Sequence, residues 1–345
     1  MGITNKEYFL LFVATYFFVG ALTPLIRKFA ISMDVLDRPD SIHKSHKQPV
    51  PYLGGLAIII GVITISYATS LISNFTSYTF WLATSVLAPA LLLGLVGLWD
   101  DIKSLSPLPR FIAQSIAGIV TSIILIATSN VGNPTGSSLI DSAITVIWVV
   151  GICNSINFFD NLDGGAAGTV AISSITLAFL AMSSNQYLIA ALSTVTAGAT
   201  LGFLVWNKHP AKIYMGDAGA LFLGVLISIL TIRLDPKTVT EIGSYFIPIF
   251  VLAIPILDTS VAVLSRFRRH MSPFQGGQDH LSHRLIRGGL SREQAAAILW
   301  SLSLLFCSFA ILISHMNFGN EMFLLGIACL LWLLLFIGFF KTSDN

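Results

Sequence analysis

Charged residues are scarce in this chain of 345 residues: only 10% are Asp, Glu, Lys or Arg, whereas 54% are hydrophobic, and the mean hydropathy is +0.81. A soluble domain has about 25% charged residues, so a water-soluble globule is excluded. A disordered chain would need the opposite composition. The net charge of +2 is too small for a nucleic-acid binder. The three cysteines, Cys153, Cys307 and Cys329, lie in apolar stretches and offer neither a disulfide framework nor a zinc spacing.

Eleven apolar stretches are each long enough to cross a bilayer as a helix, which takes about 20 residues. They show no strand-like alternation, so the fold class is all-α: a polytopic integral membrane protein. The stretches run over 8–27, 53–72, 80–99, 111–128, 139–154, 166–183, 187–206, 218–234, 245–265, 295–314 and 322–340. The stretch at 139–154 is the weakest, because it is short and carries Asp141. We expect one transmembrane domain over 1–345, with active-site loops at 31–52, 100–110, 155–165, 207–217 and 266–294.

Lysine and arginine predict the orientation of the chain. If the N-terminus lies outside, all 19 basic residues except Lys6, Arg233 and Lys237 fall on the cytoplasmic side, as the positive-inside rule requires. An odd number of spans then places the C-terminus in the cytoplasm. Most of the acidic residues fall on the same side, so we expect the chemistry to face the cytoplasm. The first stretch has no A-x-A-like site and its basic flank follows it, so we expect no cleaved signal peptide.

Two adjacent acids, Asp100 and Asp101, close the third stretch. Carboxylates at a helix C-terminus oppose the helix dipole, and these two also repel each other. The arrangement therefore indicates a compensating cation or a reaction, although a solvated helix end beside Lys103 is the alternative.

Two amides and two carboxylates recur every three residues after the fifth stretch, at Asn154, Asn157, Asp160 and Asp163. On a helix or tight turn this spacing puts them on one face. Such a face suits a sugar, a base edge or a divalent cation with oxygen ligands. A polar loop is the alternative, and Gly164-Gly165 would turn the chain into the next helix.

Asp217, in the segment MGDAG, stands where the eighth stretch begins. A helix-capping aspartate is common, but Mg²⁺ bound with a phosphate substrate needs only one or two carboxylates. The first inner loop carries Lys44, His46 and Lys47, which could attract phosphate or simply flank the membrane.

The loop at 266–294 contains a basic helical pattern. His280, His283, Arg284 and Arg287 follow the spacing i, i+3, i+4 and i+7, which predicts one face that could hold a pyrophosphate. A zinc site at the His-x-x-His pair is a weaker reading. Ser291 and Gln294 predict a capping box for the tenth stretch.

Four other charged residues near this loop keep two interpretations open. Arg266, Arg268 and Arg269 could anchor lipid headgroups. Asp258, near the inner end of the ninth stretch, is either a buried structural acid or a functional one.

Together these motifs resemble one family, the polyprenyl-phosphate N-acetylhexosamine-1-phosphate transferases, which include the phospho-N-acetylmuramoyl-pentapeptide transferase. The resemblance runs from about Asp37 to Gln294. Its motifs are Pro-x-Pro-x-x-Gly-Gly at 49–55, Asp100-Asp101, the series from Asn154 to Gly164, Gly216-Asp217-x-Gly219 and His280-x-x-His283-Arg284. Members often carry Lys where Arg110 stands, and Arg-Lys where His43-Lys44 stands.

The resemblance implies transfer of a sugar 1-phosphate, above all N-acetylglucosamine 1-phosphate, from a UDP-N-acetylhexosamine to undecaprenyl phosphate, with release of UMP. It implies an enzyme of the bacterial cytoplasmic membrane that starts a surface polysaccharide such as lipopolysaccharide or teichoic acid. Mg²⁺ is the expected cofactor, with Mn²⁺ as an alternative, and a homodimer stays open. No nucleic acid is expected as a partner.

The resemblance also assigns roles to residues. Asp100, Asp101 and Asp217 are expected to be catalytic, and Asp217 with Asn157 to hold the metal. The remaining residues are expected to bind substrate: the diphosphate by His280, His283 and Arg284; the lipid phosphate by Arg110 and Lys103; the uridine or sugar by Asn154, Asp160 and Asp163; and phosphate more generally by Lys44 and His46.

Three alternatives remain at this stage. The pentapeptide transferase of the same family differs in its sugar substrate. A secondary transporter would place its acids near the bilayer midplane, whereas these acids gather at one end of the stretches. A catalytically inactive scaffold of the same fold would not need to retain all the acidic motifs.

Overall fold

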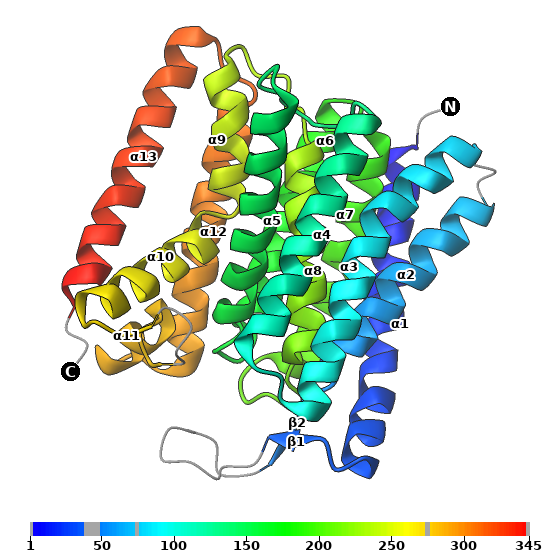
Figure 1. Ribbon diagram of the computed structural model, residues 1–345, viewed down its shortest axis with the longest axis vertical. Coiled ribbons are helices and arrows are strands. Elements are labelled where there is room, and N and C mark those ends of the chain that lie inside the picture. The colour runs from blue at the N-terminus through cyan, green and yellow to red at the C-terminus, as the bar shows by residue number, and fades with distance from the viewer. Residues whose placement is uncertain (1–2, 38–48, 73–75, 273–276, 343–345) are drawn as a thin grey trace.

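The computed structural model describes residues 3–37, 49–72, 76–272 and 277–342. They form a bundle of helices with one short antiparallel strand pair at its end (Figure 1). The elements are α1 (Asn5–Ser32), β1 (Leu36–Asp37), β2 (Val50–Pro51), α2 (Gly54–Ile72), α3 (Ser77–Lys103), α4 (Pro107–Ala127), α5 (Ser138–Phe159), α6 (Gly165–Ser183), α7 (Tyr187–Asn207), α8 (Gly216–Arg233), α9 (Glu241–Val251), α10 (Ala253–Arg268), α11 (Leu281–Arg287), α12 (Arg292–Ile313) and α13 (Phe318–Lys341).

Ten of the helices in the described part of the chain are long and apolar enough to cross a membrane, and the pair α9 and α10 raises the number to eleven if it counts as one span. Each predicted stretch corresponds to one of these elements. The all-α, polytopic membrane fold is therefore confirmed. The start of α1 and the end of α13 lie at opposite ends of the bundle (Figure 1), as an odd number of spans requires.

The stretch at 245–265 was predicted as one continuous span, and this is wrong: α9 and α10 are bent by 73° at Leu252. Proline contributes to the break. Pro255 has no N–H to donate to the carbonyl oxygen of Val251, so one hydrogen bond of a continuous helix is missing at this point. Ser173 of α6 donates a hydrogen bond of 2.7 Å to that carbonyl oxygen instead. The vacated backbone acceptor is thus satisfied away from water, as a membrane interior requires.

The centre of the bundle consists of α6, α7 and α8, which are largely buried, whereas α1 and α13 lie at its edges (Figure 1). Small residues such as Gly and Ala allow helices in a membrane to approach closely. The start of α8 shows this most clearly, since a Cβ added to Gly55 of α2 would lie 2.2 Å from the backbone nitrogen of Gly219. The N-terminal ends of α2 and α8 are therefore in backbone contact.

This contact and the strand pair lie at the end of the bundle where α3, α5 and α7 finish and α8 begins (Figure 1). The N–H groups of Gly54 and Gly55 donate to the carbonyl oxygens of Tyr214 and Met215, at 3.0 and 2.8 Å. The N–H of Tyr214 donates in turn to the carbonyl oxygen of Pro51 in β2 at 2.8 Å. Backbone hydrogen bonds thus join the first inner loop to the turn that precedes α8.

We predict that Gly55→Ala destabilises the protein, because the added methyl group would overlap the backbone of α8; overpacking typically costs about 1–3 kcal/mol. Gly151→Ala in α5 is the matched control, since nothing lies within 4 Å of its added Cβ. Melting temperatures in detergent should fall for the first variant and stay level or rise for the second. Equal melting temperatures would show that the close approach of α2 and α8 is not required.

Candidate active site

A cavity of about 550 Å³ opens at the end of the bundle where α3, α5 and α7 finish. Helices α3, α4, α5, α8 and α11 and the loops between them supply its walls. The predicted site residues that line it are Asp100, Asp101, Arg110, Asn157, Asp160, Asp163, Asp217 and His283. Residues separated by more than half of the chain are therefore brought into one polar cavity.

Arg110 stands between two of the predicted catalytic carboxylates. Its Nη1 lies 2.7 Å from Oδ2 of Asp100 and 2.7 Å from Oδ2 of Asp217. Asn157 donates from Nδ2 to the other oxygen of Asp217, also at 2.7 Å. A cation shared by two carboxylates reduces the repulsion that would otherwise separate them. The ends of α3, α4, α5 and α8 therefore meet at a single charged cluster.

Asp101 uses both of its carboxylate oxygens to cap α8. Oδ1 accepts from the backbone N–H of Asp217 at 2.8 Å, and Oδ2 accepts from that of Ala218 at 3.0 Å. Negative charge is stabilised at a helix N-terminus, where N–H groups lack partners within the helix. Gly216 has a φ of 75°, and a Cβ there would lie 2.7 Å from Oδ2 of Asp101. The glycine before Asp217 is therefore required both by the backbone angle and by the carboxylate beside it.

Asp163 lines the cavity and also holds the loop between α7 and α8 in place. Its Oδ2 lies 2.6 Å from Nδ1 of His209 and accepts from the N–H of Ala211 at 3.1 Å. Beside it, the N–H of Gly164 donates to Oδ1 of Asn207 at 3.0 Å. Gly164 has a φ of 72°, so the predicted turn into α6 is confirmed.

Asp160 is half-buried at the end of α5, next to the other acids. Burial raises the pKa of its carboxyl well above the ordinary value, and the negative charges of Asp217, Asp101 and Asp163 raise it further. A cation entering the cavity would favour the ionised form of this carboxyl. The described residues that line the cavity thus include six aspartates, Asp37, Asp100, Asp101, Asp160, Asp163 and Asp217, against two arginines, Arg110 and Arg292.

The two histidines of the predicted basic face have different environments. His283 lines the cavity, and burial together with the neighbouring His280 lowers its pKa from 6.5 to about 4. It is therefore neutral at pH 7 and can offer a ring N–H to a ligand. His280 is buried, with Nδ1 2.7 Å from Oδ2 of Asp258, and it does not line the cavity.

Asp258 is buried, and its carboxylate contacts two neighbouring residues at the start of α11. One oxygen lies against His280, and the other accepts from the N–H of Leu281 at 2.7 Å, which caps α11. A carboxylate at this helix start is favourable for the same electrostatic reason as at α8. Of the two readings left open for Asp258, the structure favours the structural one.

Arg284, predicted to bind the diphosphate with the histidines, does not share the cavity lining with His283. Its guanidinium is buried and donates to the carbonyl oxygens of Asp279, Phe339 and Thr342, at 2.8, 3.0 and 2.6 Å. Carbonyls at the end of α13 lack partners within the helix, and Arg284 supplies donors to them. Arg284 therefore joins α11 to α13 and lies outside the cavity lining.

Lipid anchoring is also ruled out for Arg266. Only 1% of this side chain is exposed, and its Nε donates to Oδ2 of Asp279 at 2.8 Å. Arg269 pairs with the other oxygen of the same carboxylate. Although burial opposes it, hydrogen bonds from Arg266 and Arg269 lower the pKa of Asp279. Arg266, in the last turn of α10, and Arg269, directly after it, therefore hold Asp279 in the loop that leads to His283.

Two more predicted residues do not line the cavity. Asn154 donates from Nδ2 to Oε1 of Gln114 at 2.7 Å, which ties α5 to α4. Lys103, the last residue of α3, is exposed outside the lining. Of the series of four polar residues, Asn157, Asp160 and Asp163 therefore line the cavity, whereas Asn154, one turn further from the end of α5, contacts α4. Lys44 and His46 lie outside the described residues.

Several cavity residues were not predicted: Asp37, Tyr52, Asn161, Asn207, Tyr214 and Arg292. Asn207 had a usable signal, because it is a polar residue that ends an apolar helix directly before a basic loop. Arg292 follows Ser291, whose predicted capping box with Gln294 is confirmed. The two tyrosines carried no signal, since only the strand pair and the turn before α8 bring them to the cavity.

The cavity residues fit a hard divalent cation. Oδ2 of Asp100 is buried and accepts no hydrogen bond from the described residues, although the charge of Arg110 is near. No group of three or more His, Cys, Asp or Glu in those residues forms a ready-made metal site. Mg²⁺, however, is usually held by one or two carboxylates together with substrate phosphates and water. Asp217 and Asp100 could supply these, and Asn157 would have to turn its amide to present oxygen.

We predict that His283 lowers the stability of the protein as the pH drops from about 6.5 toward 4. In that range the unfolded chain protonates His283 whereas the folded protein keeps it neutral, so protonation favours unfolding. The variant His283→Gln lacks this titrating group, so its melting temperature should decrease less than that of the wild type over the same pH range. Identical pH slopes for the two proteins would contradict the buried, neutral state of His283.

Comparison with known proteins agrees with this geometry. Residues 83–235 match the family described as Glycosyl transferase family 4. The probable undecaprenyl-phosphate N-acetylglucosaminyl 1-phosphate transferase of Bacillus subtilis is 34% identical over 321 residues, covering 92% of this chain and 87% of the relative. The decaprenyl-phosphate N-acetylglucosaminephosphotransferase of Mycolicibacterium smegmatis is 30% identical over 316 residues, covering 84% and 76%. The phospho-N-acetylmuramoyl-pentapeptide-transferase of Streptococcus uberis is 28% identical over 285 residues, covering 74% and 82%. The resemblance drawn from the motifs is thereby confirmed, and the chain belongs to glycosyl transferase family 4.

Proposed function

We propose that this protein transfers N-acetylglucosamine 1-phosphate from UDP-N-acetylglucosamine to undecaprenyl phosphate and releases UMP. The relatives from B. subtilis and M. smegmatis are named for polyprenyl-phosphate N-acetylglucosaminyl phosphate transfer. The more distant pentapeptide transferases of the family are the second candidate. The identity to the two N-acetylglucosamine relatives, 34% and 30%, against 28% to the pentapeptide transferase of S. uberis, favours the first.

One observation carries the proposal: Arg110 lies 2.7 Å from both Asp100 and Asp217, at the floor of a cavity that Asp160, Asp163 and His283 also line. Transfer between two phosphate-bearing substrates brings negative charges together. A site for this reaction therefore needs a positively charged group and neutral hydrogen-bond donors close together, and carboxylates that hold these groups in position. Such a cluster at one end of the helices is unlike a transporter site near the bilayer midplane.

In the proposed reaction, an oxygen of the lipid phosphate attacks the phosphorus atom next to the sugar. A new P–O bond forms there, and the bond from that phosphorus to the oxygen of UMP breaks. The products are a lipid diphosphate sugar and UMP. The second pKa of a phosphate is about 6, so the attacking dianion is abundant at pH 7 without a base. Asp100 therefore acts mainly by holding Arg110 and the local charge.

The chain's own groups divide the remaining work. Arg110 faces the incoming phosphate and neutralises it, with its orientation set by Asp100 and Asp217. His283, neutral at pH 7, donates a hydrogen bond to the diphosphate. Asp101, whose oxygens are both engaged by backbone N–H groups, acts as a positioning residue that places Asp217. Asp160 and Asn161 face the sugar or the uridine.

Members of this family use a divalent metal. We propose Mg²⁺, held by Asp217 and Asp100 together with the diphosphate of the donor. Bound there, it would withdraw charge from the phosphate oxygens and stabilise the leaving UMP. The excess of aspartates over arginines in the cavity lining, six against Arg110 and Arg292, supports a bound cation at this place.

We also propose that the cavity opens to the cytoplasm of a bacterial cell, at the inner surface of its plasma membrane. Lys208, Lys212 and Arg292 belong to the same end of the bundle as the cavity, whereas Arg233 and Lys237 lie at the far end of α8. This distribution of basic residues satisfies the positive-inside rule. UDP-sugars and UMP could then exchange with water while the lipid stays in the membrane.

We predict that Asp100→Asn and Asp217→Asn each lower the rate of UMP release by about a hundredfold or more, because both remove charge from the transition-state environment. The assay uses purified protein, undecaprenyl phosphate and a panel of UDP-sugars. Asp235→Asn, at the opposite end of α8, is the matched control and should keep near-wild-type activity. A rate near wild type for either site variant would remove that residue from the mechanism.

We predict that EDTA abolishes turnover and that Mg²⁺ restores it, with Mn²⁺ as a weaker substitute. A readout independent of turnover is the melting temperature. Mg²⁺ added with UDP-N-acetylglucosamine should raise it for the wild type by mass action, and raise it less for Asp217→Asn. Full turnover in excess EDTA would contradict a metal requirement.

A further inference from the structure

A buried arginine ends α8, at the end of the bundle opposite the polar cavity. Arg233 is only 5% exposed. Arginine is almost never buried this fully without a paired acid, because an uncompensated charge is costly to remove from water. In the part of the chain that the structure describes, no carboxylate forms an ion pair with this guanidinium. The C-terminal end of α8 supplies only about half of an opposing charge.

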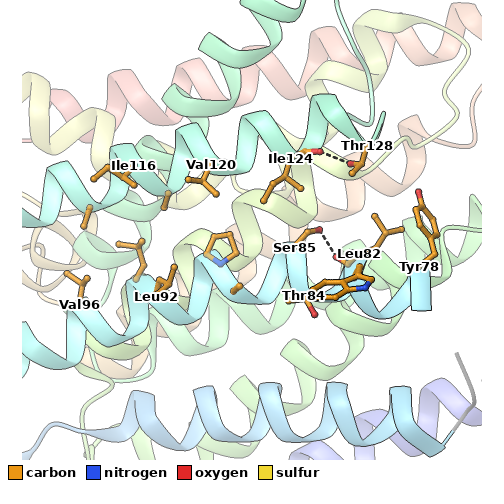
Figure 2. A pocket seen from close by; sticks show the side chains of 16 residues that line it. Tyr78, Leu82, Thr84, Ser85, Leu92, Val96, Ile116, Val120, Ile124 and Thr128 are labelled. Atoms are coloured by element: carbon orange, nitrogen blue, oxygen red, sulfur yellow. Dashed lines mark hydrogen bonds between the residues drawn. The ribbon is translucent and has the colours of Figure 1, made fainter. Parts of the chain in front are cut away.

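The partners of Arg233 are two neutral oxygens. Nη1 donates to Oγ of Ser85 at 3.2 Å, and Nη2 donates to Oδ1 of Asn130 at 3.0 Å. Ser85 gives its own proton to the carbonyl oxygen of Leu82, as a dashed line in Figure 2 marks at one end of the apolar groove between α3 and α4. A guanidinium has five N–H groups. Since two donate here, three are left for a ligand.

Arg233 lines a cavity of about 340 Å³ at this end of the bundle. Its walls come from the loop after α4, the turn before α7 and the segment after α8. Hydrogen bonds hold these three segments together. The N–H of Gly132 donates to the carbonyl oxygen of Ile232 at 2.9 Å, and the N–H of Asp235 donates to Oε1 of Gln186 at 3.2 Å. The cavity is therefore a formed part of the fold.

The lining of this cavity carries an excess of one positive charge. Its charged members among the described residues are Arg233, Lys237 and Asp235. Asp235 pairs with Lys237, whose side chain is 68% exposed, so the charge of Arg233 is the one that stays unmatched. Lys6, Arg233 and Lys237 are the three basic residues that the positive-inside rule leaves on this side. Two of these three thus line one cavity.

The chemistry of this lining favours a phosphate ester. The planar fork of a guanidinium matches the oxygens of phosphate with two parallel hydrogen bonds. A phosphodiester carries a single negative charge, which equals the single positive charge in excess here. The cavity is also in the size range of small-molecule sites, which begins at about 300 Å³, so a phosphodiester with a short polar group fits.

We propose that this cavity binds a phosphodiester at the membrane face opposite the polar cavity, with Arg233 as its main contact and Lys237 as a second. The site is separate from the transfer reaction and does not depend on the proposed function. Anionic phospholipid headgroups and their soluble, deacylated forms share this chemistry. A bound phosphodiester supplies the charge that the fold leaves out, and it joins the loop after α4 to the end of α8.

The test follows the melting temperature of the purified full-length protein in detergent at constant ionic strength. Phosphatidylglycerol, phosphatidylcholine or glycerophosphoglycerol is titrated in. Phosphatidylglycerol should raise the melting temperature by mass action, and by more than phosphatidylcholine does. Arg233→Gln should weaken the apparent affinity about tenfold, which is about 1.4 kcal/mol, because the charge-assisted hydrogen bonds are lost. Lys6→Gln removes an exposed base from the same side and is the matched control, with unchanged affinity.

Two results support the site if Arg233→Gln weakens them. A shift with both phosphatidylglycerol and glycerophosphoglycerol assigns it to any phosphodiester, and a shift with the lipid alone assigns it to a headgroup in the membrane. Equal shifts with the two lipids, or equal affinities for wild type and Arg233→Gln, overturn the proposal.

A shift that is lost in Arg110→Gln but kept in Arg233→Gln also overturns the proposal, since the anion then binds in the polar cavity. If Arg233→Gln does not fold, Lys237→Gln decides, because this exposed side chain pairs with Asp235 alone among the described residues. Weaker binding by Lys237→Gln than by the wild type supports the site, and unchanged binding overturns it.

Discussion

The carboxylate of Asp101 holds the end of α3 against the first turn of α8, and the candidate site takes its shape from that contact. It satisfies two backbone N–H groups of α8 that would otherwise lack partners. The glycine at 216 is what lets the carboxylate come so near. Once the two helices are joined, Asp100 and Asp217 necessarily face each other, and Arg110 between them relieves their repulsion.

A second set of buried ion pairs shapes the loop that carries His283. Asp258 accepts a hydrogen bond at the N-terminus of α11, and Asp279 pairs with the guanidinium groups of Arg266 and Arg269 at the end of α10. Burial of a lone charge is costly, so such groups persist only in pairs with good geometry. Arg266, Arg269 and Arg284 are therefore used to build this region, whereas His283 and Arg292 line the cavity.

The membrane fold and the identity of the acidic motifs were predictable, because apolar length and glycine–acid spacing are local signals. The break between α9 and α10 was not predictable from local signals. It depends on Ser173 of α6, which donates a hydrogen bond to the carbonyl oxygen of Val251 that Pro255 leaves without a partner in the helix. In the site, Asp100, Asn157 and Asp217 were placed together through the family resemblance. Arg284 was grouped with the histidines on the basis of helical spacing. That spacing shows which residues share a helix face, but it does not show whether the face contacts a ligand or another helix, here α13. Tyr52 and Tyr214 reach the cavity through tertiary contacts alone.

The attachment of Arg284 to Phe339 and Thr342 has a practical consequence for handling the protein. Helix α13 has little buried surface of its own, and its last turn is held by Arg284 together with Arg268, whose guanidinium lies over the ring of Phe340. Affinity tags and fluorescent fusions placed directly after residue 342 would pull on the arginine next to His283. A spacer is therefore needed there, whereas the beginning of α1, at the far end of the bundle, is the safer place for a label (Figure 1).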